Sequence, residues 1–143
     1  MRYEHTQRAY LLHWIVTPLI LIVLVGMFSG GATPWLWILV TVLVVSFTWL
    51  VVTFSMLTVI VDGDQIRVYF GRGWPRRTVS KREVTTVVPV RNQWWHGLGI
   101  WIIPKGTLWN VWGLDAVELR LESGRVFRIG TDDADGLTAA IAL

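Results

Sequence analysis

The residues best suited to binding chemistry are six basic side chains that follow the second long apolar stretch of the sequence. They are Arg67, Arg72, Arg76, Arg77, Lys81 and Arg82. Beside a membrane, each such cation is attracted to an anionic leaflet by about 1 kcal/mol. The group fits nonspecific charge anchoring, a defined lipid-headgroup site or a protein-binding surface. It also fits the positive-inside rule, which enriches the cytoplasmic flanks of membrane spans in basic residues.

A second candidate site is the tripeptide Trp94-Trp95-His96, which the surrounding turn residues place in a loop. Two adjacent indole rings in a loop cannot both enter one small core, so we expect at least one to be exposed. An exposed tryptophan suits a membrane interface or a protein partner. For Trp101 and Trp109, packing in the core explains the residue type as well as any contact does.

The sequence shows no arrangement typical of an active site. Its three histidines, His5, His13 and His96, lie far apart and lack the spacing of metal ligands, and there is no cysteine. The acidic residues Asp132, Asp133 and Asp135 suit the first turn of a helix. We therefore expect a non-enzymatic protein without a metal or cofactor. The mixed charges of the domain also argue against nucleic acid as a partner.

Two long stretches, residues 11–28 and 35–57, contain no charged side chain. Helices over these ranges are ~27 Å and ~34 Å long, close to the ~30 Å thickness of the hydrocarbon core. The connection Ser29–Pro34 consists of turn-forming residues, so the two helices must run antiparallel. The pattern predicts a transmembrane hairpin. A cleaved signal peptide is the alternative for the first stretch, although that stretch is longer than a usual signal core.

The distribution of basic residues predicts the orientation of this hairpin. Arg2 and Arg8 precede it, the basic group follows it, and the connection between the helices is uncharged. Both termini are therefore expected in the cytoplasm. Gly26 and Gly30 have the spacing of a helix-dimer motif, although the glycine-rich turn beside them is the alternative explanation.

The remaining residues, 58–143, form the expected cytoplasmic domain, with residues 1–10 as a separate cytoplasmic segment. Asp62-Gly63-Asp64 is a strong hairpin signal, and the flanking segments alternate between apolar and polar residues. Similar segments continue to Ile129 and predict about seven strands. A helix is expected from about Ala134 to Leu143, with Leu137 and Ile141 on its apolar side. The fold class is α+β: a helical hairpin, then a small β-sandwich or open barrel with a C-terminal helix.

Several stretches of this domain resemble the bacterial pleckstrin-homology (PH) domain membrane proteins. They are residues 96–100, 106–111, 116–119 and 123–125, together with Gly113 and Gly130-Thr131-Asp132. In that family one or two membrane helices commonly precede a PH-like domain, so the resemblance implies this fold and the bacterial cytoplasmic membrane. Eukaryotic PH domains hold phosphoinositide headgroups on a basic early hairpin, but bacteria mostly lack those lipids.

These observations favour a membrane-anchored binding or scaffold module. We expect it to act through self-association or through a membrane protein partner, since a non-catalytic domain acts through what it holds. The main alternative is a sensor of anionic lipid headgroups, and a further one is an accessory subunit of a membrane transport complex.

Overall fold

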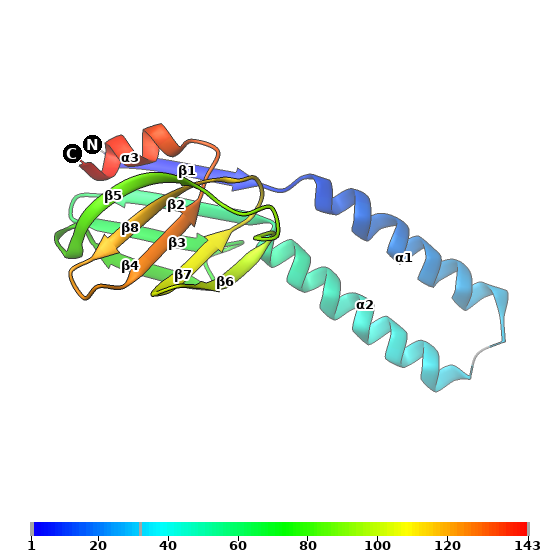
Figure 1. Cartoon of the computed structure of the whole chain (residues 1–143). Helices are drawn as coiled ribbons and strands as arrows, with labels where there is room; N and C mark the ends of the chain where they lie inside the picture. The colour runs from blue at the N-terminus through cyan, green and yellow to red at the C-terminus, as the bar shows by residue number, and fades with distance from the viewer. Residues whose placement is uncertain (1, 32, 143) are drawn as a thin grey trace.

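The computed structural model describes residues 2–31 and 33–142, with the side chains of residues 11–13, and so that of His13, outside the described part. Two helices near the N-terminus extend away from a β-rich domain that ends in a short helix (Figure 1). This architecture confirms the predicted α+β class. The helical pair precedes most of the strands and a helix follows the last strand, as predicted. The first element, however, is a strand, β1 (Arg2–Arg8), and the described residues form nine strands where about seven were expected.

The two long helices are α1 (Leu11–Ser29) and α2 (Pro34–Phe54). Pro34 occupies the first turn of α2, where its missing N–H is not needed. Helix α2 ends three residues before the predicted end of the second span, because Met56 and Leu57 already belong to a strand. Of the described helical segments, α2 is long and apolar enough to cross a membrane, and the apolar segment Trp14–Ser29 of α1 is shorter.

The first sheet contains four antiparallel strands in the order of the chain. They are β1 (Arg2–Arg8), β2 (Met56–Asp62), β3 (Gln65–Phe70) and β4 (Arg76–Ser80). Strand β1 pairs with β2 over its whole length, from Arg2 opposite Asp62 to Arg8 opposite Met56. The N-terminal segment is thus part of the β domain. The helical hairpin is inserted between two strands that are hydrogen-bonded neighbours.

The second sheet has five strands in the order β5-β8-β9-β7-β6. They are β5 (Val84–Arg91), β6 (Gly99–Ile103), β7 (Gly106–Asn110), β8 (Asp115–Leu121) and β9 (Val126–Gly130). Strands β7 and β9 pair in parallel, and the other neighbours are antiparallel. The short helix η1 (Lys81–Glu83) joins the sheets, and α3 (Ala134–Ala142) follows β9.

The core lies between the two sheets and under α3. In β3, Ile66, Val68 and Phe70 are fully buried while Arg67 is exposed, so the predicted alternation is confirmed. Trp109 is also buried, with its ring centroid 5.3 Å from that of Phe70 and 5.8 Å from that of Phe127. The core is completed by Leu57, Val59, Val117, Leu119, Ile129, Leu137 and Ile141.

Helices α1 and α2 contact each other but leave an open groove between them. The ring of Trp37 packs on Gly26, where an added Cβ would lie 2.7 Å from the ring. Val16 and Val51 are buried near the β domain. The groove has a volume of about 480 Å³ and is lined mainly by Ile20, Val23, Leu24, Thr41, Val45 and Thr48.

Candidate interaction surface around the base of the helices

Three loops of the β domain lie at the end from which α1 and α2 leave (Figure 1). In the β3–β4 turn, Gly71 donates its backbone N–H to the carbonyl oxygen of Met56 at 2.9 Å. In the β7–β8 turn, Trp112 accepts a 2.5 Å hydrogen bond from Nε2 of Gln7 at the end of β1. The β5–β6 loop reaches the same end because Gly99 pairs with Asn110.

Each of these three loops carries exposed tryptophan. The exposed fractions are 66% for Trp74, 80% for Trp94, 54% for Trp95 and 53% for Trp112. Tyr10 and Trp14, at the beginning of α1, are exposed as well. We call these six residues the aromatic rim. Large aromatic side chains that remain in solvent on several adjoining loops indicate a surface made for contact.

The turns at the opposite end of the β domain have a different composition. They comprise residues 63–64, 81–83, 104–105 and 122–125, and contain no aromatic residue. Most of their side chains are charged, among them Asp64, Arg82, Glu83, Glu122 and Arg125. The exposed tryptophans are therefore concentrated at the helical end, and the two ends of the domain suit different environments.

Four exposed arginines accompany the aromatic rim. Arg8 ends β1, Arg72 lies in the β3–β4 turn, Arg76 begins β4 and Arg91 ends β5. Within residues 2–31 and 33–142, none of the four forms an ion pair. The helical end of the domain thus combines indole rings with arginines that form no close ion pair in the described part, although Arg91 lies opposite Asp115 in the β5–β8 ladder.

The six basic residues singled out in the sequence do not form one surface. Only Arg72 and Arg76 lie at the helical end. Arg67 pairs with Asp62 at 3.5 Å, and Arg82 pairs with Asp64 at 3.1 Å. The other two residues bind elsewhere: Nζ of Lys81 donates to the carbonyl oxygen of Ala140 at 3.0 Å, and Nη1 of Arg77 donates to Oγ1 of Thr107 at 2.8 Å.

The loop that presents Trp94 and Trp95 is held by buried polar side chains. Nδ2 of Asn110 donates to the carbonyl oxygen of His96 at 2.9 Å, and Asn110 is fully buried. The rings of Trp94 and Trp95 meet edge to face at 5.6 Å. His96 is half-buried and its ring lies 6.0 Å from that of Trp101, so its structural role is to pack inside the loop.

The beginning of the same loop is fixed by a partly buried ion pair on the second sheet. Glu118 receives a 2.7 Å hydrogen bond from Arg128 and a 3.2 Å bond from Arg120. Arg128 also donates to Oδ1 of Asn92 at 3.3 Å. The hydrogen bond from Arg128 is the main reason that the pKa of Glu118 lies below its usual value of 4.5, although burial opposes the shift.

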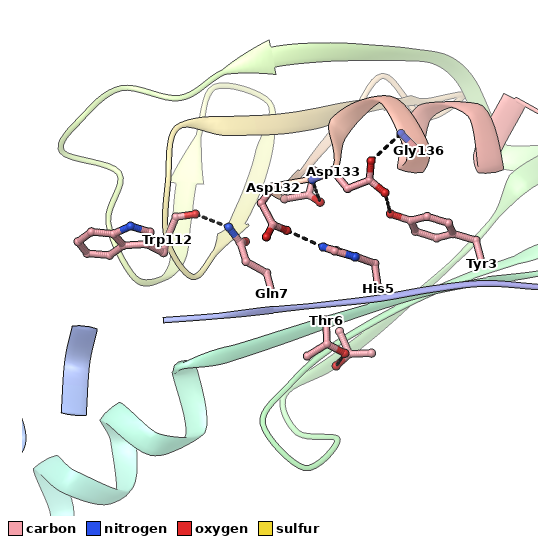
Figure 2. A network of polar contacts seen from close by, with 10 residues as sticks. Tyr3, His5, Thr6, Gln7, Trp112, Asp132, Asp133 and Gly136 are labelled. Atoms are coloured by element: carbon pink, nitrogen blue, oxygen red, sulfur yellow. Dashed lines mark hydrogen bonds and ion pairs between the residues drawn. The ribbon is translucent and has the colours of Figure 1, made fainter. Parts of the chain in front are cut away.

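A polar network joins β1 to the beginning of α3 (Figure 2). The phenol of Tyr3 donates to Oδ2 of Asp133 at 2.9 Å, and Nε2 of His5 lies 2.5 Å from Oδ1 of Asp132. The other oxygen of Asp133 accepts from the backbone N–H of Gly136 at 3.0 Å, which confirms its expected role at the helix N-terminus. Burial, and then the hydrogen bond to Asp133, raise the pKa of Tyr3.

Residues 2–31 and 33–142 contain no group of three or more histidine, aspartate or glutamate side chains placed to hold a metal ion. No protein-family model matches this chain. No curated protein sequence matches it either.

Proposed function

We propose that this chain is a non-enzymatic, membrane-anchored binding module. In this proposal α1 and α2 both cross the bacterial cytoplasmic membrane, and the PH-like β domain lies against its cytoplasmic surface. The observation that carries the proposal is the insertion of the helical hairpin between β1 and β2, with the aromatic rim around its base.

The short connections between helices and strands support a β domain held close to the bilayer. The backbone N–H of Ala9 donates to the carbonyl oxygen of Ser55 at 2.8 Å. The antiparallel pairing of β1 and β2 therefore continues to the residues from which the two helices extend. Helix α2 contains 21 residues, and at about 1.5 Å per residue it matches the ~30 Å hydrocarbon core. With the helices inserted, the aromatic rim lies at the depth of the lipid headgroups.

The composition of the rim fits this location. Indole rings prefer the interface, where the ring is partly desolvated and its N–H still meets water or headgroups. Arg8, Arg72, Arg76 and Arg91 add attraction to anionic lipids, at about 1 kcal/mol for each charge near the surface. The turns at the other end, with Asp64, Glu83 and Glu122, face the cytoplasm in this arrangement.

The groove between α1 and α2 favours a second candidate function, which is assembly with a second copy through the membrane helices. The groove is apolar, and the hydroxyl of Thr48 in it is buried without a hydrogen-bond partner among the described residues. A helix from another copy would fill the groove and offer that hydroxyl a partner. The mass of the protein in detergent, from light scattering, tests this candidate. A discrete oligomer supports it, and a monomer leaves a separate protein as the partner.

Cysteine labelling tests the membrane arrangement, because the protein has no cysteine of its own. Ser29→Cys marks the tip of the hairpin and Ser123→Cys marks the far end of the β domain. In sealed vesicles with the cytoplasmic face outward, an impermeant maleimide should label only the variant at position 123 until detergent is added. Equal labelling of both variants before detergent would contradict a hairpin that crosses the membrane.

A further inference from the structure

A cavity remote from the aromatic rim lies between the β6–β7 and β8–β9 turns. The two turns are adjacent because β7 and β9 pair in parallel, with Gly106 opposite Val126. The backbone N–H of Val126 donates to the carbonyl oxygen of Lys105 at 2.8 Å. A Cβ at position 106 would lie 1.6 Å from the carbonyl oxygen of Val126, so this close approach requires glycine. The turns are therefore fixed relative to each other.

The cavity has a volume of about 410 Å³ and three cationic side chains among its lining residues. These are Arg77, Lys105 and Arg125, and no acidic residue lines the cavity. None of the three forms an ion pair in the described part of the chain. The positive charge of these three side chains therefore has no counterion within the described structure.

Arg77 is held in place before any ligand arrives. Its guanidinium carbon lies 4.3 Å from the centroid of the Phe127 ring, and its Nη1 donates to Thr107. These contacts fix the planar group while leaving most of its N–H donors free for an anion. Burial, and then the positive charge of Arg125, lower the pKa of Arg77, as expected for cations that converge without an acid between them.

We propose that this cavity binds a phosphate-type oxyanion, either free phosphate or the phosphoryl group of a small soluble molecule. In this site the guanidinium group of Arg77 supplies two or more N–H donors in a fixed orientation. Lys105, from the β6–β7 turn, and Arg125, from the β8–β9 turn, add two further positive charges. The hydroxyl of Ser123 is a further donor in the lining. The cavity lies where β7 and β9 begin, whereas their other ends point toward the aromatic rim, so headgroups of the host bilayer are out of its reach.

The experiment uses the full-length protein in nanodiscs of phosphatidylcholine, which present no net negative lipid charge to the rim. Inorganic phosphate and pyrophosphate are titrated by calorimetry at constant ionic strength, with chloride as the balancing anion. We expect saturable binding, weakened about fivefold by either Lys105→Gln or Arg125→Gln, since each removes one charge-assisted contact. Arg82→Gln removes one exposed arginine at the same end outside the cavity, and should change the affinity less than twofold.

In phosphatidylcholine nanodiscs, either of two outcomes would overturn the proposal. One is the absence of saturable binding of both anions, and the other is an equal effect of Arg125→Gln and Arg82→Gln. Repeating the titration in phosphatidylglycerol nanodiscs distinguishes the source of the anion. Unchanged affinity identifies a soluble ligand, whereas competition by the lipid would refute a cavity beyond the reach of headgroups. Because maleimide labelling tests the membrane arrangement separately, failure of this proposal is distinguishable from failure of the proposed function.

Discussion

Arg8 and Met56 face each other in the β1–β2 ladder, although the entire helical hairpin separates them along the chain. The two helices thus leave the domain where a tight turn would normally join two strands. Both termini of the hairpin are fixed by backbone hydrogen bonds, and the domain has no long linker on which to move away from the helices.

This pairing predicts that the helical hairpin is replaceable by a tight turn. Replacing residues 10–54 with Asn-Gly should connect Ala9 to Ser55 through a two-residue turn and yield a soluble, folded β domain, since that dipeptide favours a tight hairpin. Circular dichroism and dispersed amide resonances would establish folding. The matched control removes residues 1–55, which exposes the edge of β2 and should cause aggregation. Equal solubility and folding of both proteins would contradict an essential role for β1.

The sequence permitted prediction of elements whose signals are local. The β2–β3 and β8–β9 hairpins, α2 and α3 each carry their own turn, apolar or capping residues. Strand β1 lacks such a signal because its partner follows the hairpin, and its residues are mostly polar. The separation of the six basic residues onto different surfaces also depends on the tertiary fold. In β4, for example, side chains alternate, so that Arg76 points outward and Arg77 points toward the core. The sequence predicted exposure within the Trp94-Trp95 pair, but not the rest of the rim, because Trp74 and Trp112 come from separate loops that only the tertiary fold brings beside this pair.

The hydrogen bond from Tyr3 to Asp133 should stabilise the attachment of β1 to α3. Tyr3→Phe removes only the hydroxyl, and we expect the free energy of unfolding to fall by about 1 kcal/mol. Urea unfolding of the protein in detergent, followed by near-ultraviolet circular dichroism, measures the change. Tyr69→Phe is the matched control, because Tyr69 is half-buried but its hydroxyl has no side-chain hydrogen bond in the described structure.

The raised pKa of Tyr3 gives the same bond a pH dependence. Folding favours the neutral phenol, so its contribution is complete below the usual pKa of 10.0 and is lost as the pH rises through the higher pKa of the folded state. The wild-type protein should therefore lose more stability than Tyr3→Phe between pH 9 and strongly alkaline solution, within ~1 kcal/mol in total. Parallel alkaline titration curves for the two proteins would refute this contribution.

The ion pair of Glu118 with Arg128 predicts a dependence of stability on acid pH. Because the pKa of Glu118 is lowered in the folded protein, its contribution is complete above the usual value of 4.5 and is lost as the pH falls through the folded-state pKa. Glu118→Gln should destabilise the protein at pH 7 and flatten the acid side of its stability curve. Urea midpoints between pH 7 and pH 3 measure this slope. Glu122→Gln, at an exposed turn position, should leave the slope unchanged.

The proposed contact of the aromatic rim with lipid predicts the depth of the β5–β6 loop. A nitroxide attached to Gln93→Cys in nanodiscs should be protected from a water-soluble nickel relaxant and accessible to oxygen, because the adjoining tryptophans draw the loop into the interface. Adding Trp94→Ser and Trp95→Ser should reverse that preference. Ile102→Ser removes an apolar side chain outside the rim that is more exposed than either tryptophan, and it should leave the preference intact. If the label at position 93 is fully exposed to nickel in the otherwise unmodified protein, the rim does not contact the membrane.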